Sequence, residues 1–478
     1  MPPSNNIYPT NNQNVNMQSP MGAQNPPLTA VNPTIQSPTT PPKKKNSTLF
    51  LIIGAVLLLV VLVFAGIKIF GKPSTGKNSG EIVWWGLWEN KSTVQPLIAA
   101  YESSHPGIKV TYVEQSKEDY RERLSNSLAK NEGPDIFTIH NTWVPMFKSE
   151  LDALPSSVMT AADYSKSFYP VITSDSSYGN SIVGIPLGYD ALTLFINEDI
   201  FAKTGKNPPS NWDDLRTLAK ELTIKDEKGI AQSGIALGRT ENVDHWQEIL
   251  ALLMIQNGVD LNNPTGQNAE DALKFFTLFS SVDGVWDTTL PTSTQAFAAG
   301  KLAMYFAPSW RAFEIQTKNP SLKFKAVPLP QLPKNVPDEA DISYSTYWMQ
   351  GVWSKSVNKS LSWDFLNYMA STESLQKLYQ NESVARGFGE AYPRTEMAGL
   401  LNDNPILGPI VAQAPGARSW YLASRTFDGE TGINTQISNY FKDAVNAVAE
   451  GDMSETEALE IVSMGVRQVL SQYGISIR

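Results

Sequence analysis

Apolar and polar positions follow two periods in the part of the chain after residue 80. A short apolar run rich in aromatic residues at 81–88 predicts a buried strand. Apolar residues recur at helical spacing in 94–101, and the alternation at 108–112 predicts a second strand. A helical pattern at 120–128 then leads to a third strand at 135–139. The order strand, helix, strand, helix, strand predicts a mostly parallel α/β sheet.

The same kind of pattern begins again after residue 185. Residues 191–196 predict a strand, and Ser210 with Asp213 forms a capping-box pattern for the helix that follows it. Because the residues after position 80 exceed what one hydrophobic core usually holds, we expect two lobes. The remaining predicted elements are helices at 246–253 and 294–299, strands at 302–306 and 347–353, a helix at 363–369, and helical structure from about 433 onward.

A different pattern precedes residue 80. Residues 1–48 are Pro/Asn-rich and predict a disordered tail, because such a stretch cannot bury enough apolar area to offset chain entropy. The uncharged apolar run at 49–67 has a helical length of about 28 Å, close to the hydrocarbon thickness of a bilayer. We therefore expect one transmembrane helix as an anchor at 49–70, followed by a linker at 71–80.

The lysines on either side of the apolar run predict its orientation. A lysine triplet at 43–45 lies against its N-terminal edge, whereas three further lysines are scattered beyond its other edge. This distribution predicts a single-pass protein of the cell membrane with a cytoplasmic N-terminus and an extracellular body. A cleaved signal peptide is the alternative, although the residues after Ala65-Gly66 make a poor cleavage site.

Charge and composition exclude several classes of function. The first 80 residues carry six lysines and no acidic residue, so the chain's net charge of −9 leaves −15 on residues 81–478. Such an acidic body argues against nucleic acid as a partner. The absence of cysteine excludes disulfides, thiol catalysis and a lipid-modified cysteine, and three histidines leave little for a metal site. We expect no cofactor and no metal, and the few histidines leave little for a catalytic triad.

Several short motifs occur in an order that resembles a known family. They are IVWW at 82–85, HPGIKV at 105–110, GPDIF at 133–137, GIP at 184–186, FIN at 195–197, PSNWDDL at 209–215 and FAAGKLAM at 297–304. Their order is similar to that in extracellular solute-binding proteins of family 1, the maltose-binding-protein-like receptors of ABC sugar importers. The resemblance covers about 81–475, which is the whole body.

The resemblance implies a two-lobe periplasmic-binding-protein-like α/β fold that closes an interlobe cleft on its ligand by a hinge. Lobe 1 would comprise 81–189 and 347–405, and lobe 2 would comprise 190–346 and 406–478. The protein would be a monomer that binds a sugar or oligosaccharide and delivers it to ABC permease subunits. The missing cysteine anchor and the long tail depart from the family pattern. They leave open an anchored sensor or adhesin that uses the same cleft.

The chemistry of sugars selects the candidate site residues. Sugars present apolar C–H faces and a rim of hydroxyls, so their sites combine aromatic platforms with carboxylate and amide partners. Ligands of parallel α/β sheets lie outside the carboxyl ends of the strands, where this chain offers Glu89, Asn90 and Trp143. With the positions that the resemblance adds, the predicted ligand-binding residues are Glu89, Asn90, Trp143, Asp190, Trp310, Tyr347, Arg394 and Trp420.

A carbohydrate-active enzyme is a further alternative. Glu89 and Asp190 are in principle suited to act as the paired carboxylates of a glycosidase, which requires about 5–10 Å between them. The residues alone do not separate that reading from binding, whereas the family resemblance favours binding. We therefore expect a receptor and not an enzyme.

Overall fold

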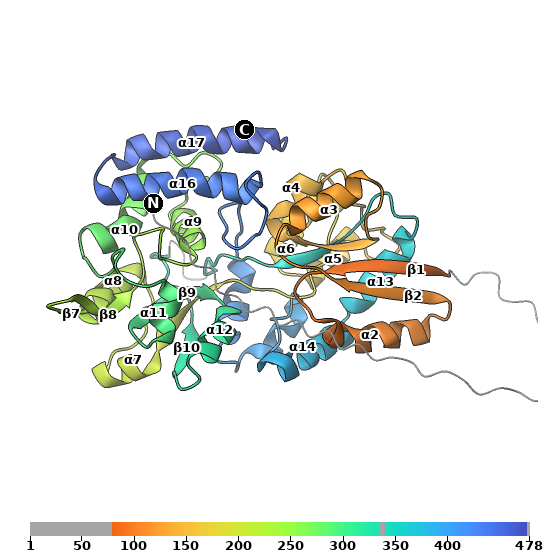
Figure 1. Ribbon diagram of the computed structural model, residues 1–478, viewed down its shortest axis with the longest axis horizontal. Coiled ribbons are helices and arrows are strands. Elements are labelled where there is room, and N and C mark those ends of the chain that lie inside the picture. Colours follow the sequence, from red (N-terminus) through yellow and green to blue (C-terminus); the bar gives the residue numbers. More distant parts are fainter. Residues whose placement is uncertain (1–78, 335–339, 476–478) are drawn as a thin grey trace, which may run out of the picture. The chain divides into compact units, whose positions relative to one another are not determined.

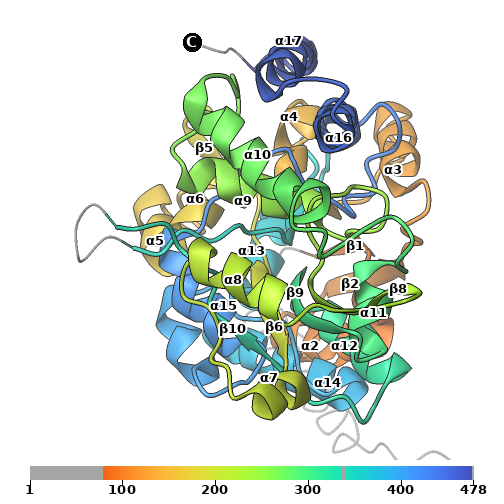
Figure 2. The same cartoon turned by 90° about the vertical axis from the view of Figure 1, so that its left-hand side faces the viewer.

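The computed structural model describes residues 79–334 and 340–475. In these residues the chain folds into two α/β lobes, each built on its own main sheet (Figures 1 and 2). The tail predicted at 1–48, the anchor predicted at 49–70 and most of the predicted linker lie outside the described residues. No helix in the described part is both long and apolar enough to cross a membrane.

The sheet of lobe 1 has four strands in the order β11-β3-β1-β2. Strand β1 (Gly80–Gly86) runs parallel to β2 (Ile108–Glu114) and to β3 (Ile136–His140), whereas β11 (Trp348–Val352) joins β3 antiparallel. This confirms the predicted parallel pairing of the first three strands. The other elements of this lobe are α2 (Lys91–Ser104), α3 (Tyr120–Ala129), η1 (Asn141–Trp143), α4 (Val144–Phe147), α5 (Ala161–Ser167), α6 (Pro170–Asp175), β4 (Ser177–Tyr178), β5 (Ser181–Ile182), α13 (Lys359–Met369), α14 (Thr372–Arg386) and η2 (Thr395–Leu401).

The sheet of lobe 2 has five strands in the order β10-β6-β9-β8-β7, and only β8 and β9 run parallel. The repeated apolar pattern therefore predicts where the strands of this sheet occur. It does not predict their direction, because most neighbouring strands here run antiparallel although the pattern is the same as in lobe 1. The elements are β6 (Leu192–Asn197), α7 (Glu198–Thr204), α8 (Trp212–Glu221), β7 (Ile224–Asp226), β8 (Gly229–Ile235), α9 (Trp246–Gln256), α10 (Gln267–Ser281), α11 (Ser293–Ala298), β9 (Leu302–Pro308), α12 (Arg311–Lys318), β10 (Phe324–Val327), α15 (Gly408–Gln413), η3 (Ala414–Gly416), α16 (Ile433–Glu450) and α17 (Glu455–Gln472).

The start of α8 corrects one sequence prediction. The capping residue is Asn211, whose side-chain oxygen accepts a hydrogen bond of 2.8 Å from the backbone N–H of Asp214. The predicted capping box of Ser210 and Asp213 is therefore wrong by one residue. Both patterns fit the sequence because asparagine and serine are equally good N-cap residues.

Two extended segments, 187–192 and 343–348, pass between the lobes, and we call them the crossing segments. They pair antiparallel, since the backbone N–H of Thr346 donates to the carbonyl of Asp190 at 3.0 Å and Leu192 donates to Tyr344 at 2.8 Å. The chain passes beside them a third time at Arg418, which exchanges backbone hydrogen bonds with the second segment. The exact limits of the two lobes, predicted at 189/190, 346/347 and 405/406, remain a prediction.

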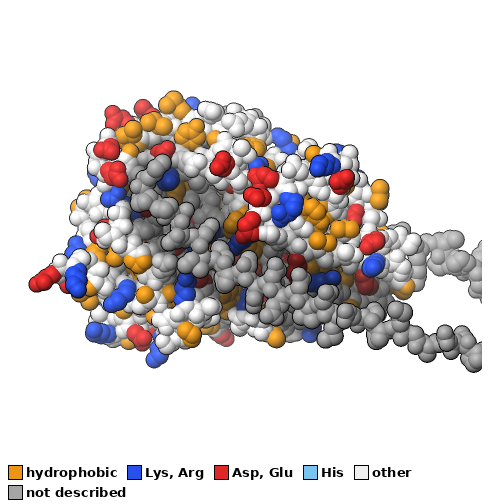
Figure 3. Space-filling model, viewed as in Figure 1, with side chains coloured by type: hydrophobic (Ala, Val, Ile, Leu, Met, Phe, Trp, Pro, Cys, Tyr) orange, Lys and Arg blue, Asp and Glu red, His pale blue; other side chains and the backbone are white. Residues whose placement is uncertain are grey.

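The surface of one side of the molecule agrees with the mixed composition of the body. On the face seen in Figure 3, acidic and basic side chains are interspersed over the described residues, and no broad basic patch is visible there. A nucleic-acid interface requires such a clustered positive surface. This face therefore offers no support for nucleic acid as a partner.

Candidate functional site

The pairing of the crossing segments creates two faces with different chemistry. Side chains of an extended strand alternate between its two sides, and residues directly opposite each other share a side. Asp190 and Thr346 are opposite each other and lie on one side, which we call the Asp190 face. Tyr189 and Tyr347 lie on the other side, with their ring centroids 5.8 Å apart, and we call it the Tyr347 face.

On the Asp190 face, the carboxylate of Asp190 ties the crossing to lobe 2. It accepts hydrogen bonds from the backbone N–H of Ser309 at 3.1 Å, the hydroxyl of Ser309 at 2.8 Å and the N–H of Ala191 at 2.8 Å. Burial raises the pKa of Asp190 to about 7, and the negative charge of Glu390 adds to the rise although the hydrogen bonds oppose it. Asp190 therefore fixes the turn between β9 and α12, directly beside Trp310.

Trp310 is half-buried, and a cation holds its ring in place. The guanidinium of Arg311 lies 4.4 Å from the centroid of the Trp310 ring, and the ring of His245 meets it edge-on at 5.5 Å. Arg311 is itself buried, donates to Nε2 of His245 at 2.9 Å and pairs with Asp244 at 3.2 Å. Burial lowers the pKa of His245, so its neutral ring can accept this bond. The indole is therefore a pre-positioned platform.

Aromatic rings from both lobes meet where β1 ends. Trp88 is 37% exposed, and its ring lies 5.3 Å from that of Trp348 in lobe 1 and 5.8 Å from that of Phe427. Phe427 belongs to the connection between η3 and α16 and reaches across from lobe 2. Trp88 follows β1 just as Glu89 does, so the argument from strand ends could have selected it. Trp348 could have been found because side chains alternate along a strand, which places it on the side opposite to its neighbour Tyr347. Phe427 lies in an irregular loop, and nothing in the sequence pattern distinguishes it.

Carboxylates gather next to these rings. Burial raises the pKa of Glu89 and of Glu382, and the charge of Glu390 raises both further. Nη2 of Arg386 lies 3.0 Å from Glu382 and 3.6 Å from Glu390. Among the described residues, Oε2 of Glu89 is buried without a hydrogen-bond partner. Asn90 is exposed at the start of α2, and its side chain makes no capping bond.

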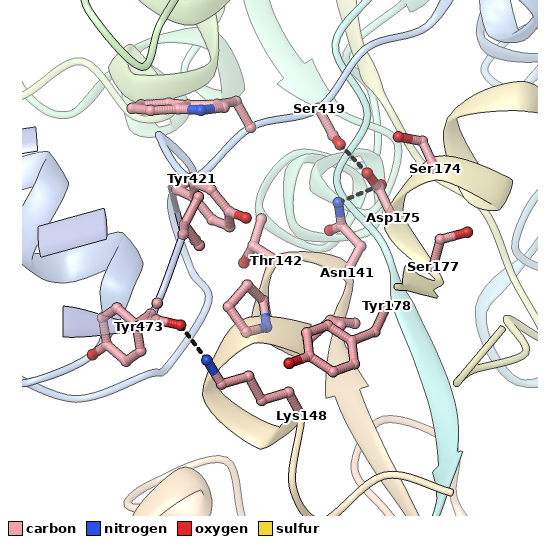
Figure 4. A pocket seen from close by; sticks show the side chains of 15 residues that line it. Asn141, Thr142, Lys148, Ser174, Asp175, Ser177, Tyr178, Ser419, Tyr421 and Tyr473 are labelled. Carbon is pink, nitrogen blue, oxygen red and sulfur yellow. Dashed lines mark hydrogen bonds between the residues drawn. The ribbon is translucent and has the colours of Figure 1, made fainter. Parts of the chain in front are cut away.

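The Tyr347 face is built around Asp175 instead. The hydroxyl of Tyr347 donates to Asp175 at 2.8 Å, the amide of Asn141 donates at 2.9 Å and the hydroxyl of Ser419 donates at 2.5 Å. Asp175, Asn141 and Ser419 border a cavity of about 320 Å³ (Figure 4), and Tyr347 lies behind Asp175 outside its lining. Trp420 also lines this cavity, and its indole N–H donates to Asn262 at 3.2 Å. Tyr347 and Trp420 are thus connected through Asp175, which binds Tyr347 and lines the same cavity as Trp420.

Two of the eight predicted residues join neither group. Trp143 is fully buried, and its ring stacks between those of Tyr120 at 6.2 Å and Phe147 at 5.8 Å. Arg394 donates to Glu396 at 2.8 Å and lies 5.5 Å above the ring of Phe168. The structure therefore places Trp143 in the core of lobe 1 and Arg394 in a salt bridge on the flank of that lobe.

The remaining predicted residues divide between the two faces. Asp190 lies on the Asp190 face with Trp310 beside it, and the charge of Glu390, which acts on both Asp190 and Glu89, links Glu89 and its neighbour Asn90 to that face. Tyr347 binds Asp175 on the Tyr347 face, and Trp420 lines the cavity there. Within 79–334 and 340–475, no group of three or more His, Asp or Glu side chains is placed to hold a metal ion. What both faces offer is a set of hydrogen-bonding and aromatic groups suited to holding a small molecule.

Comparisons with known proteins identify the fold and its relatives. The model of a family described as bacterial extracellular solute-binding protein matches residues 85–376. A putative binding protein of Brucella abortus (strain 2308) is 22% identical over 330 residues, covering 67% of this chain and 77% of that protein. A putative ABC transporter periplasmic-binding protein of Escherichia coli (strain K12) is 24% identical over 212 residues, covering 43% and 48%. The structure of the sugar-binding protein MalE from Xanthomonas citri superposes with a TM-score of 0.67 at 18% identity, covering 82% of this chain and 98% of that one.

Proposed function

The chain belongs to the bacterial extracellular solute-binding protein family, and on that premise we propose that its Asp190 face binds a sugar or oligosaccharide for an ABC importer. The proteins of this family are receptors and not enzymes. The relative from Escherichia coli is named as part of an ABC transporter, and the structural neighbour from Xanthomonas citri is named as a sugar-binding protein. Both names support the proposal without assigning a particular solute to this chain.

The observation that carries the proposal is the set of half-exposed tryptophans at the boundary of the lobes. Trp88 and Trp348 belong to lobe 1, whereas Trp310 follows β9 of lobe 2. Tryptophan is the largest apolar platform for the C–H face of a sugar ring, and an indole fixed by neighbours loses little entropy on binding. Glu89 next to Trp88 provides an unoccupied acceptor for a sugar hydroxyl.

A solute held by both lobes favours the arrangement in which the lobes are in contact. The lobes are in contact in this structure: the ring of Phe313 in α12 lies 4.2 Å from the ring of Phe388, which follows α14, and the ring of Phe427 contacts that of Trp88. A ligand that contacts both sides binds this arrangement more tightly than a separated one and shifts the population toward it. The permease would then recognise the solute-loaded form.

We also propose that residues 49–70 anchor the receptor to the membrane and leave its body outside the cell. The support is the apolar length of this segment and the lysine triplet before it. The test is fractionation of cells that express the full chain. An anchored protein stays with the membranes after alkaline carbonate and is released by detergent, whereas a protein found in the medium contradicts the anchor.

The sugar site is tested by a thermal-shift screen of the full chain in detergent against mono- and oligosaccharides. A ligand at a hundred times its dissociation constant should add about 2.7 kcal/mol to the free energy of unfolding. Trp310→Ala and Trp88→Ala should each weaken the affinity for that sugar at least tenfold with little change in melting temperature. Each ring keeps part of its surface accessible, and that part gains apolar contact only when the ligand is bound.

The matched control is Tyr178→Ala, which removes an aromatic ring of similar exposure, 48%, from the Tyr347 face. This variant should keep the affinity of the unmodified protein for the sugar. If Trp310→Ala and Trp88→Ala bind as tightly as the unmodified protein, the Asp190 face is not the sugar site. If Tyr178→Ala alone weakens binding, the sugar belongs to the cavity on the Tyr347 face.

A further inference from the structure

The cavity on the Tyr347 face, which we call the hinge pocket, is walled by both lobes. Figure 4 shows that lobe 1 contributes side chains from η1, α6 and β4 and the lysine after α4, and that lobe 2 contributes side chains from the segment after η3 and the tyrosine after α17. Its volume of about 320 Å³ is within the range of small-molecule sites. Its lining is rich in hydroxyl groups and includes Asn141, Thr142, Lys148, Ser174, Asp175, Ser177, Tyr178, Ser419, Trp420, Tyr421 and Tyr473.

Asp175 brings a negative charge into this pocket that no cation among the described residues pairs with. Its three hydrogen-bond partners, Asn141, Tyr347 and Ser419, are all neutral. Burial raises the pKa of Asp175 to about 6 even though these three bonds oppose the rise, and within 79–334 and 340–475 no cation lowers it. The carboxylate is therefore held in a fixed position by donors that do not cancel its charge. A carboxylate has room for further donors beyond these three.

Lys148 brings a positive charge to the same pocket, and no carboxylate of residues 79–334 or 340–475 forms an ion pair with it. Its ammonium donates to the backbone carbonyl of Tyr473 at 2.6 Å, and two of its three protons stay available for other acceptors. Gly474, with φ +71°, turns the chain after α17 so closely past Lys148 that an added Cβ would lie 2.7 Å from Nζ. The end of lobe 2 therefore holds this lysine of lobe 1 in place.

We propose that the hinge pocket binds a small zwitterion, such as a free amino acid or a betaine, separately from the sugar. The ammonium group of the ligand meets Asp175, and its carboxylate meets Lys148. The half-buried ring of Trp420 and the exposed ring of Tyr178 provide the surface for the apolar part. A zwitterion compensates both fixed charges at once, whereas a neutral sugar compensates neither and an ion of one sign repels one of them.

Occupancy of this pocket is coupled to solute binding, because each ligand contacts both lobes. The hinge pocket and the Asp190 face lie on opposite sides of the same crossing segments, so both ligands act on one equilibrium between lobe arrangements. Whichever sign the coupling takes, the zwitterion changes the affinity for the solute by the same factor as the solute changes the affinity for the zwitterion. This coupling rests on the proposed sugar site, whereas binding of the zwitterion does not.

The test is titration calorimetry of the full chain with the proteinogenic L-amino acids and glycine betaine, without sugar. At least one zwitterion should bind, and its N-acetyl and carboxamide derivatives, which each lack one charge, should bind at least tenfold more weakly. Lys148→Gln should weaken the zwitterion at least tenfold, because it removes a charge-assisted hydrogen bond. The same variant should leave sugar affinity in the absence of zwitterion within about twofold, if the sugar binds the Asp190 face.

Asp175→Asn provides the second arm. Its amide oxygen keeps the acceptor that Tyr347 and Asn141 share, and its NH2 group faces the Ser419 hydroxyl, which is able to accept. The substitution removes the negative charge, so it should weaken the zwitterion at least tenfold. Trp310→Ala is the control, because its side chain belongs to the other face and should leave zwitterion affinity unchanged. The proposal is overturned if no zwitterion binds, if the singly charged derivatives bind equally well, or if Lys148→Gln keeps full affinity. If Trp310→Ala changes only the affinity for sugar, that result bears on the proposed sugar site and does not test the proposed zwitterion site.

Discussion

The two faces of the crossing segments differ in how they treat charge and aromatic surface. The Asp190 face presents tryptophan rings from both lobes beside carboxylates whose pKa values are raised, and Arg311 and Arg386 are already engaged there. The Tyr347 face presents hydroxyl groups, one carboxylate at Asp175 and one ammonium at Lys148, and the hydrogen-bond partners of both among the described residues are neutral. The first arrangement suits a neutral molecule with apolar and hydroxyl faces, and the second suits a molecule that carries both charges.

Adjacent residues of the crossing segments contribute to different faces. Tyr347 and Trp348 are adjacent, yet the hydroxyl of Tyr347 binds Asp175 whereas the ring of Trp348 meets that of Trp88. Tyr189 and Asp190 divide in the same way. Because an extended segment alternates its side chains, a hinge made of two such segments carries two independent surfaces within a few residues. One ligand on each surface is then able to act on the same hinge.

The largest expected effect concerns the support behind the Asp190 face. Trp143→Ala should lower the free energy of unfolding by about 3–5 kcal/mol, because it leaves a cavity in the core between Tyr120 and Phe147. The ring of Trp143 also meets that of Trp348 edge-on at 5.4 Å, so sugar affinity should fall with it. Urea denaturation and the sugar titration measure the two effects.

The control for this variant is Trp310→Ala, which removes a half-buried ring of the same size and should cost the folded state much less. Zwitterion affinity should survive in Trp143→Ala under conditions in which the protein is folded. If Trp143→Ala leaves the free energy of unfolding unchanged, the ring is not part of the core, and its predicted role at the ligand regains support.

Local patterns in the sequence predict most elements of the fold because they depend on near neighbours. The helical faces at 94–101 and 120–128 and the alternating strand at 108–112 occur as predicted, since burial of one face fixes their period. The direction of the strands in lobe 2 depends instead on which distant segments pair, as β6 does with β9. No local pattern encodes that pairing.

The candidate site is less predictable for a similar reason. Residue type and strand ends point correctly to the neighbourhood of Glu89 and Trp310, but they do not say which face of a crossing segment a residue occupies. Trp143 follows a strand end, yet η1 turns its ring into the core. Asp175 ends a six-residue helix in a polar stretch, where a solvated loop charge is the ordinary expectation. Only the fold brings it together with Tyr347.

An effect of intermediate size is expected in the pH dependence of stability, to which the carboxylates of the two faces contribute over different pH ranges. Asp190 and Asp175 have an ordinary pKa of 3.8, which the fold raises to about 7 and about 6. The folded state therefore binds more protons than the unfolded state above pH 3.8, and the free energy of unfolding falls as pH rises through each window. Between about pH 6 and about pH 7 the contribution of Asp190 still changes, whereas that of Asp175 has levelled off.

The test compares denaturation curves across this range for two matched variants. Asp190→Asn should flatten the dependence of stability on pH up to about 7, and Asp175→Asn should flatten it only up to about 6. Both substitutions keep the shape of the side chain and remove one titrating group. Equal profiles for the two variants would mean that the two carboxylates share one environment, contrary to the two-face arrangement.

The smallest expected effect is at Arg394, which lies on neither face. Its side chain is 15% exposed, pairs with the half-exposed Glu396 and also donates to the carbonyl of Ala370 at 3.1 Å. The partly exposed ion pair contributes about 0–1 kcal/mol because water screens it, and the hydrogen bond contributes about 1 kcal/mol. Arg394→Ala should therefore lower the free energy of unfolding by about 1–2 kcal/mol, including the contact with the Phe168 ring. Its affinities for sugar and zwitterion should match those of the unmodified protein in calorimetry.

The control is Glu396→Ala, which removes the partner of the ion pair and should likewise leave both affinities unchanged. A tenfold loss of sugar affinity in Arg394→Ala alone would show that the solute reaches this flank of lobe 1, and the sugar site would then extend beyond the Asp190 face.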